Sequence, residues 1–243
     1  MPMKPNFVRK KKRQVHGATF WDREYTNPEH LKLSTNESAD LAKFTRWVIR
    51  RERGDVLAEE ASALDVGCGN GRNLIYLAMQ FNMHGVGFDI SSAAISQAKV
   101  ASKDLNITYE VRKAEELLPT ADNSQSLVLD MMTSHFLNHK ARVQLRDEIF
   151  RTLKPGGYLF MKTFLKDKDL HTARLIKERP GTEDGSYIHP VMGVAEYVYS
   201  EEELVAFLSE KFIVRKIYRS HKHAFKGRAR KRRTISLYVE KDY

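Results

Sequence analysis

The stretch "ALDVGCGNGRN", residues 63–73, constrains the fold of this 243-residue chain more than any other part. Apolar residues alternate into Asp65, as in a short buried strand, and glycine follows at positions 67, 69 and 71. Apolar residues at helical spacing come next. Glycine lets a ligand touch the backbone, and a following helix points free N–H groups at the site. The stretch therefore predicts a ligand cradle, with an ordinary strand-to-helix turn as the alternative.

The alternation of strands and helices continues beyond this stretch. Strands are expected at residues 62–67, 84–91, 107–114, 126–133 and 158–164. Helices are expected at residues 39–53, 71–81, 92–105 and 140–153. Strands that alternate with helices predict a parallel sheet joined by right-handed crossovers.

The last part of the sequence follows a different pattern. Ser200 and Glu203 have capping-box spacing at the start of a helix over residues 200–211. Strands are then expected at residues 212–222 and 232–241, and no helix lies between them, so they should pair antiparallel. The predicted fold is α/β and doubly wound. It has a mostly parallel seven-stranded sheet, helices on both faces and an antiparallel C-terminal strand pair.

The sequence also predicts how the chain is organised. We expect a disordered basic arm at residues 1–16 and a single Rossmann-like domain at residues 17–243. An insertion at about residues 166–200 follows the fifth strand, so it can form a wall over the substrate side or a merely structural flap. A basic hairpin loop is expected at residues 221–233.

Positive charge is concentrated at two places in the chain, whose net charge is +10. Residues 1–21 hold six Lys or Arg and no acid, and residues 221–233 hold seven and no acid. In this fold the loop leaves the sixth strand on the ligand side of the sheet. Basic residues 4–13 and 222–233 are therefore expected to attract RNA or another polyanion. A solvated hairpin and a small-molecule acceptor stay open as alternatives.

Several classes of protein are disfavoured by composition. No apolar run reaches the roughly 20 residues that a membrane span needs, and the basic N-terminus lacks the apolar region of a secretory signal. Cys68 is the only cysteine, which excludes an internal disulfide and a cysteine-based zinc site. His135 and His139, with His189, could be metal ligands, but no carboxylate accompanies them, so no metal is expected. A cytoplasmic location is predicted.

Two carboxylates indicate which ligand the glycines hold. The glycine spacing is G-x-G-x-G rather than the dinucleotide G-x-G-x-x-G, and Asp65 lies two residues before Gly67. A carboxylate there would repel a diphosphate and attract an ammonium or sulfonium group. Asp89, 22 positions after Gly67, stands where a carboxylate accepts ribose hydroxyls. A ligand with a ribose and a cationic amino-acid end is S-adenosylmethionine.

Several motifs in order resemble one family. "LDVGCGNGRN", "GFDIS" and "LKPGGYLFMKTF" are similar to the motifs of class I S-adenosylmethionine-dependent methyltransferases, and so is the closing strand pair, over about residues 60–240. "GCGNGRNLIYLA" and "FWDREY" look most like the tellurite-resistance and thiopurine methyltransferase subgroup. There are departures, since Lys113 stands where the family often has an acid, and the fourth strand ends in "DMMT" without an Asn/Asp-Pro-Pro-aromatic motif.

The resemblance implies a cofactor and its contacts. The cofactor is S-adenosylmethionine and the product S-adenosylhomocysteine. The implied cofactor-binding residues are Asp65, Gly67, Cys68, Gly69, Asn70, Gly71, Asn73, Asp89, Ile90, Ala114, Glu115, Asp130 and Met131. In this scheme Asp65 and the glycine turn hold the methionine end, and Asp89 holds the ribose. Asp130 and Met131 face the methionine moiety.

Other residues are candidates on the substrate side. Trp21 and Tyr25 could close over the cofactor or form a plain hydrophobic staple, and His135, Tyr187 and His189 are polar groups near the predicted acceptor. The candidates for a general base are Asp130, His135, Tyr187 and His189. The sequence does not rank them, so no catalytic residue is assigned. Cys68 is expected to pack rather than to act as a nucleophile.

The resulting hypothesis is an enzyme that transfers a methyl group in line to a nucleophilic N, O or S of an unidentified acceptor. The acceptor would be a small molecule, or RNA or another acidic macromolecule. The alternative is a non-catalytic RNA-binding or scaffold protein that keeps the fold. An NAD-dependent oxidoreductase is disfavoured by the glycine spacing and by Asp65.

Overall fold

The computed structural model describes residues 17–30, 33–51, 54–220, 224–225, 228–229 and 232–242. The expected arm at residues 1–16 and most of the expected basic loop at residues 221–233 lie outside the described residues. Within the described ranges, no helix is both long and apolar enough to cross a lipid bilayer.

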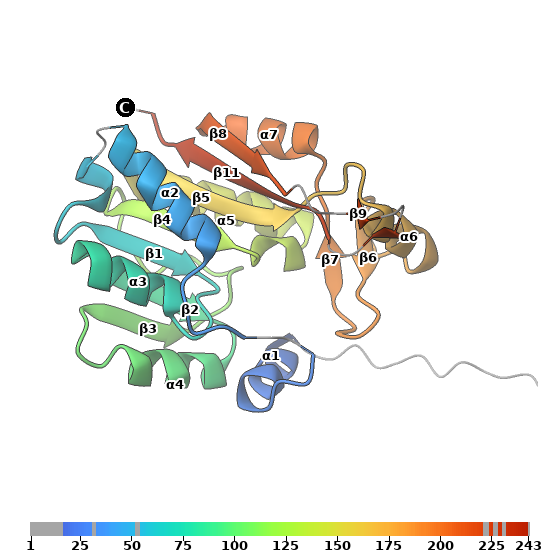
Figure 1. Cartoon of the computed structure of the whole chain (residues 1–243), viewed down its shortest axis with the longest axis horizontal. Helices are drawn as coiled ribbons and strands as arrows, with labels where there is room; N and C mark the ends of the chain where they lie inside the picture. Colours follow the sequence, from blue (N-terminus) through green and yellow to red (C-terminus); the bar gives the residue numbers. More distant parts are fainter. Residues whose placement is uncertain are drawn as a thin grey trace, which may run out of the picture.

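A seven-stranded sheet forms the centre of the molecule, in the order β3-β2-β1-β4-β5-β11-β8 (Figure 1). Its strands are β1 (Ser62–Val66), β2 (His84–Asp89), β3 (Ile107–Val111), β4 (Gln125–Met131), β5 (Leu153–Phe164), β8 (Ile213–Arg219) and β11 (Thr234–Glu240). The first five strands are parallel. Strand β11 lies antiparallel between β5 and β8. The predicted fold class is thus confirmed.

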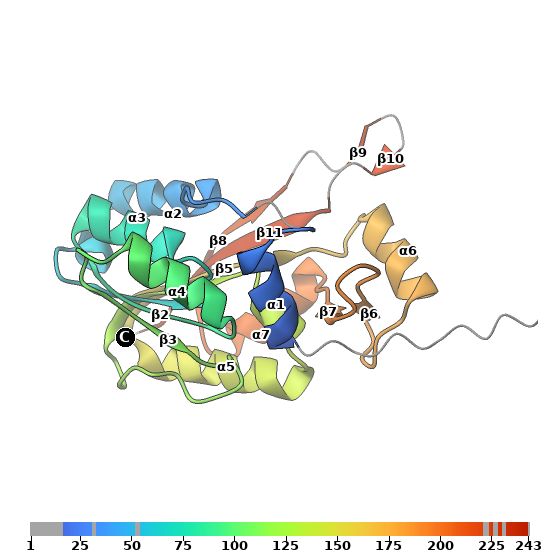
Figure 2. The same cartoon turned by 90° about the horizontal axis from the view of Figure 1, so that it is seen from below.

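Helices cover both faces of this sheet, as predicted (Figure 2). The α-helices are α1 (Gly17–Thr26), α2 (Ala39–Arg50), α3 (Arg72–Phe81), α4 (Ser92–Ala101), α5 (His139–Thr152), α6 (Leu170–Glu178) and α7 (Glu201–Ser209). Two 3₁₀ turns accompany them, η1 (Gly54–Leu57) and η2 (Ser134–Phe136). Helices α2, α3 and α4 cover one face, and α5 and α7 cover the other. The expected capping box at Ser200 and Glu203 begins α7.

Each face of the sheet carries its own apolar cluster. On the α2 side, Phe44 stacks on Phe160 of β5 at 5.2 Å between ring centroids and meets Tyr238 of β11 edge-on at 4.8 Å. On the other side, Leu145 of α5 and Leu204 of α7 are buried against β1, β4, β5 and β11. Burial on both faces explains why the central strands are almost continuously apolar.

The expected insertion folds into small elements beyond β5 (Figure 1). Helix α6 and a hairpin of β6 (Ser186–Ile188) and β7 (Ala195–Tyr197) enclose a satellite cluster of Leu175, Tyr187 and Val198. A second hairpin pairs β9 (Ala224–Phe225) with β10 (Arg228–Ala229) between β8 and β11. The division into a basic arm and a single domain stays a prediction.

Candidate functional site

A cavity of about 1000 Å³ lies at the carboxyl ends of β1, β2 and β4. Open parallel sheets bind ligands where the strand order reverses, and here β1 pairs with β2 on one side and with β4 on the other. Helix α1, the glycine turn and the residues after β4 contribute to its wall, and so do Ala195, the first residue of β7, and Val194 just before it. The volume is at the upper end of the roughly 300–1,000 Å³ typical of ligand sites.

The glycine turn forms one wall of this cavity and leaves no room for side chains. Gly67 and Gly69 have φ of 67° and 56°, in the left-handed region. A Cβ atom on Gly67 would collide with the side chain of Thr133, and one on Gly69 would collide with the hydroxyl of Tyr25. Both glycines line the cavity, so a ligand there meets backbone, as the sequence predicts.

Asp89, at the end of β2, links the turn to the cavity wall. Its carboxylate accepts a hydrogen bond from the Gly69 N–H and another from the Ser91 N–H, both at 2.9 Å. Burial raises the pKa of Asp89 above its usual value, although these hydrogen bonds favour the ionised form. The carboxylate both shapes the turn and lines the cavity, where it could accept hydroxyl groups.

Asp65, in β1 just before the glycine turn, shows whether the site suits the expected cofactor. Its side chain is buried, and its Oδ2 atom has no hydrogen-bond partner among the described residues. Burial and the neighbouring charge of Asp89 raise the pKa of Asp65 to about 8. A buried carboxylate of this kind is stabilised by a cation nearby. The site therefore fits a cofactor whose amino-acid end is positively charged.

We predict a pH dependence of stability from Asp65. Its pKa is about 8 in the folded protein and about 3.9 when unfolded, so between these values the folded state binds more protons. The contribution of Asp65 to the free energy of unfolding is therefore fully present below about pH 4 and is lost as the pH rises through about 8. Urea unfolding of the cofactor-free protein at pH 5 and pH 8 should show a smaller decrease for Asp65→Asn than for the wild type. Equal decreases would contradict the raised pKa.

Helix α1 covers the cavity with two predicted residues, Trp21 and Tyr25. The Trp21 ring meets Phe136 edge-on at 5.5 Å between centroids. Asp22 fastens α1 to α4, because its Oδ1 atom accepts hydrogen bonds from the Ser91 hydroxyl at 2.7 Å and the Ala93 N–H at 3.1 Å. The helix is thus held over the glycine turn, and its role as a cover for the cofactor stays a prediction.

Most of the predicted cofactor contacts lie together on the cavity wall. Those that line it are Gly67, Cys68, Gly69, Asn70, Asn73, Asp89, Ile90, Ala114, Glu115 and Met131. Cys68 is buried in the turn, and burial raises the pKa of its thiol, so it has the character of a packing residue. Gly71 faces away, since a Cβ there would meet Tyr109. Lys113, the departure from the family pattern, also lines the cavity.

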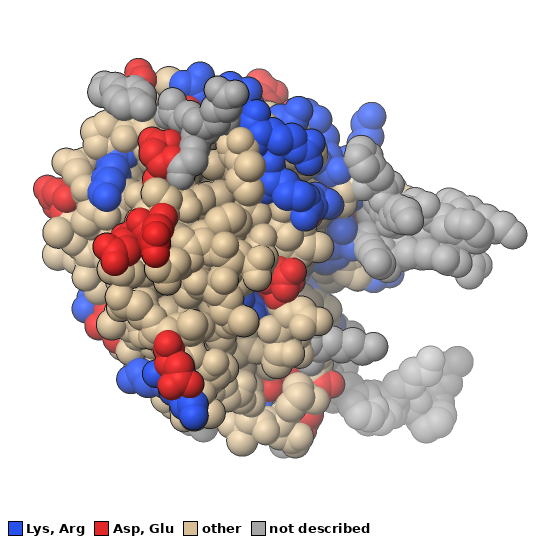
Figure 3. Space-filling model, turned by 60° about the vertical axis from the view of Figure 1, so that its left-hand side comes forward, with Lys and Arg blue, Asp and Glu red and all other residues tan. Residues whose placement is uncertain are grey.

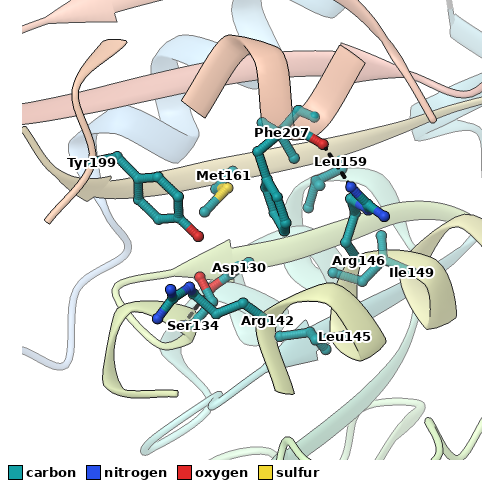
Figure 4. A pocket seen from close by; sticks show the side chains of 11 residues that line it. Asp130, Ser134, Arg142, Leu145, Arg146, Ile149, Leu159, Met161, Tyr199 and Phe207 are labelled. Carbon is teal, nitrogen blue, oxygen red and sulfur yellow. Dashed lines mark hydrogen bonds between the residues drawn. The ribbon is translucent and has the colours of Figure 1, made fainter. Parts of the chain in front are cut away.

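The structure does not bring Asp130 to this cavity, which corrects the expectation from the sequence. Consecutive side chains of a strand point to opposite faces, so Met131 lines the cavity and Asp130 faces α5. Figure 4 shows Asp130 beside Ser134, Arg142 and Tyr199, around a separate space of about 10 Å³. Its Oδ1 atom accepts from the Ser134 N–H at 3.1 Å.

That smaller space has room for about one water molecule. Three buried atoms that face it lack a partner among the described residues, namely Ser134 Oγ, Arg142 Nε and Tyr199 Oη. Asp130 itself accepts from the N–H of Ser134, the first residue of η2. Asp130 therefore positions the segment that carries Phe136 rather than a ligand.

The predicted residues His135, Tyr187 and His189 do not line the large cavity either. His135 is buried without a hydrogen-bond partner in the described part of the chain, and burial lowers its pKa to about 4. The Tyr187 hydroxyl donates to Glu196 inside the insertion. His189 Nδ1 accepts from the Met192 N–H at 3.1 Å. In this structure these side chains pack or stabilise the insertion.

Two cations of the expected basic loop are also part of the fold. Arg232 Nη1 donates to the buried Glu196 at 2.6 Å, and its guanidinium lies 3.3 Å from the centre of the Phe164 ring. The Arg233 N–H donates to Asp169, also at 2.6 Å. Arg233 Nη1 also donates to the Asp167 carbonyl at 2.9 Å. Both guanidinium groups therefore have partners within the fold, and the expected attraction of a polyanion by residues 222–233 stays a prediction.

Sequence reasoning missed several residues of the cavity wall. They are Ser34, Ser38, Arg72, Thr133, Phe136, Leu137, Lys162, Val194 and Ala195, among others. The position of Lys162 on β5 could have been found from the strand register, because it lies opposite Met131. Its Nζ pairs with Asp40 at 2.5 Å. No group of three or more metal-ligating side chains occurs in the described ranges.

Comparisons with known proteins agree with this geometry. Residues 63–157 match a family model described as a methyltransferase domain. An uncharacterized protein of Haemophilus influenzae is 32% identical over 120 residues, which are 48% of this chain and 47% of that protein. The chain spans about half the length of the first two curated relatives that it matches.

Solved structures extend the similarity to the whole fold. A structure described as S-adenosylmethionine-dependent methyltransferases from Methanosarcina mazei is 25% identical, with a TM-score of 0.61, and the match covers 77% of this chain and 95% of that one. The N-methyltransferase NodS of Bradyrhizobium japonicum, solved with S-adenosylhomocysteine, is 15% identical and shares the fold with a TM-score of 0.63, over 93% and 98% of the chains.

These similarities agree with the sheet order, with the glycine turn and with the two carboxylates beside it. The ordered motifs expected from the sequence lie around one cavity, and the matched domain spans the strands that build it. Residues 63–157 therefore match a methyltransferase domain, and the domain match and the shared fold together support a class I S-adenosylmethionine-dependent methyltransferase.

Proposed function

We propose that this protein transfers a methyl group from S-adenosylmethionine to a nucleophilic N, O or S atom of an acceptor. The observation that supports this most is the large cavity whose walls combine the glycine turn and the Asp89 carboxylate, close to the buried Asp65, whose Oδ2 atom has no partner among the described residues. The cavity extends past Met131 to Phe136, Lys162 and Val194, which leaves space for an acceptor group beside the cofactor.

The chain's own residues would bind, orient and exclude water. When bound, the cofactor supplies an activated methyl group on a sulfonium. Asp89 would accept the ribose hydroxyls, and the charge of Asp65 would favour the ammonium group. Trp21 and Phe136 would keep water from the reacting atoms. Positioning and water exclusion account for most of the rate in this scheme.

We assign no general base for the acceptor among the described residues that line the cavity. Apart from Asp89 and Glu115, no carboxylate or histidine in the described part of the chain lines the cavity. Tyr25 is held protonated at neutral pH, since burial raises the pKa of its hydroxyl and Asp89 adds to this effect. We therefore propose an acceptor that is already nucleophilic, such as an amine in its free-base form or a thiolate.

Charge on the cavity wall bears on the class of acceptor. Four cations line it, namely Arg72, Arg112, Lys113 and Lys162, against Asp89 and Glu115. Two of the four are compensated, because Lys162 pairs with Asp40 and Arg112 pairs with Glu110. Together with basic residues 4–13 and the remaining cations of residues 222–231, they support RNA or another polyanion as the partner. The alternative function is a non-catalytic RNA-binding or scaffold protein, favoured by the same charge.

We predict that the protein will transfer labelled methyl groups. The full chain would be incubated with methyl-labelled S-adenosylmethionine and, separately, with total cellular RNA, a protein extract and a small-molecule extract. Incorporation into one pool, absent with Asp89→Ala, is expected. Tight cofactor binding without incorporation into any pool would favour the scaffold alternative.

A further inference from the structure

A group of exposed cations lies on the sheet face that α2 covers, away from the cavity wall. Lys43, Arg46 and Arg50 are exposed and share one side of α2, because residues three and four apart are neighbours on a helix. Lys216 and Tyr218 are exposed on the edge strand β8. We name these five residues the α2–β8 surface.

The two parts of the α2–β8 surface are joined through Tyr238 of β11. Its ring lies 5.1 Å from that of Trp47 on α2 and 5.4 Å from that of Tyr218. Lys216 lies directly opposite Tyr238 in the strand register. Figure 3 shows lysine and arginine side chains gathered in the upper right of that view. The cations of α2 and of β8 therefore lie on neighbouring elements that share the contacts of Tyr238.

Little of this positive charge is compensated by acids. Only Lys43 has an ion pair among the described residues, with Asp40 at 3.2 Å. No described carboxylate lies within ion-pair distance of Arg46, Arg50 or Lys216. Elsewhere on the surface arginines are paired, as Arg219 is with Glu201. Uncompensated cations that share one face attract a polyanion.

The aromatic member favours one kind of polyanion. The Tyr218 side chain is 42% exposed, and Lys216 Nζ lies 5.4 Å from its ring centre. Proteins that bind single-stranded nucleic acid combine aromatic rings with cations, because bases stack on the rings and phosphates contact the cations.

The direction of α2 connects this surface with the cavity. Helix α2 begins beside Ser38, its N-cap, which also lines the cavity. Figure 2 shows β9 and β10 rising on the same side of the sheet as α2. We propose that the α2–β8 surface binds single-stranded nucleic acid, with phosphates on Lys43, Arg46, Arg50 and Lys216 and a base on Tyr218. This inference names a partner for the proposed enzyme, but binding itself does not depend on methyl transfer.

The test is binding of the full chain, without cofactor, to fluorescent single-stranded RNA and DNA oligonucleotides, followed by anisotropy at several salt concentrations. The triple variant Arg46→Glu, Arg50→Glu, Lys216→Glu should weaken binding at least about tenfold and flatten the salt dependence. The matched control reverses three exposed lysines on other helices, Lys99→Glu, Lys140→Glu and Lys177→Glu, with the same change in net charge. It should retain most of the affinity.

Tyr218→Ala keeps every charge and should weaken binding about fivefold or more. Equal losses in the triple variant and its control would overturn the proposal, as would unchanged affinity in Tyr218→Ala. Equally tight binding of polyglutamate would also overturn it and would point to an acidic protein. Because the assay contains no cofactor, its failure is distinguishable from failure of methyl transfer. The relative affinities of the protein for the RNA and DNA oligonucleotides show which of the two nucleic acids it prefers.

Discussion

Replacing Asp89 by alanine should weaken binding of S-adenosylmethionine by about a hundredfold or more. Hydrogen bonds to a charged group each contribute about 1.5–3 kcal/mol, and the proposed ribose contact has two. The substitution also removes the acceptor of the Gly69 N–H, so the turn keeps only its backbone hydrogen bond from the Cys68 N–H to the Phe88 carbonyl as a link to the end of β2. Calorimetric titration with S-adenosylmethionine and S-adenosylhomocysteine measures the effect.

The controls for this prediction separate binding from folding. Asp104→Ala removes an exposed carboxylate outside the cavity and should leave affinity unchanged. Asp89→Asn keeps one acceptor and should give an intermediate loss. Thermal unfolding of each variant shows whether the protein stays folded. An unchanged dissociation constant in folded Asp89→Ala would place the ribose elsewhere and remove the main support for the proposed function.

Gly69→Ala should weaken cofactor binding by a similar factor, and part of that loss should be restored by Tyr25→Phe. The new methyl group would occupy the space of the Tyr25 hydroxyl, and an alanine with left-handed φ adds about 1–2 kcal/mol of strain. Removing the hydroxyl relieves the collision and leaves the strain. Titration of the two single variants and the double variant gives the coupling between the residues.

Gly17→Ala is the matched control, because Gly17 also lines the cavity and a Cβ there meets nothing within 4 Å. It should bind the cofactor like the wild type. If the double variant binds no better than Gly69→Ala alone, then contact between α1 and the turn does not limit the space there. In that case the loss arises from backbone strain or from contact with the cofactor itself.

The sequence predicted correctly those features of the fold and the site that are encoded by residues close together in the chain. The glycine turn, Asp89 and the alternation of strands and helices are each encoded within a few neighbouring residues, and the structure has them where the sequence places them. Asp130 was misplaced because a strand buried on both faces has no polar alternation to show which side each residue faces. Only the packing of α5 and α7 against one face of β4 decides it.

The insertion was less predictable for a related reason. Strands β6 and β7 have three residues each and no clear periodicity. Their arrangement depends on distant partners, above all on the ion pair between Glu196 and Arg232. Read alone, Arg232 is one more cation in a basic run. Its burial follows only from an acid that lies 36 residues away in the sequence.

The position of β11 has a consequence for how the protein is made. Strand β8 precedes β11 in the chain, yet it reaches the sheet only through β11, which separates it from β5. During synthesis β8 and α7 therefore emerge before the strand that ties them to the sheet exists. The edge of β5 stays open to other strands during that interval, which is a risk for aggregation. A chain on a ribosome that stalls before residue 234 would contain the glycine turn and strands β1 to β5 but would lack β11.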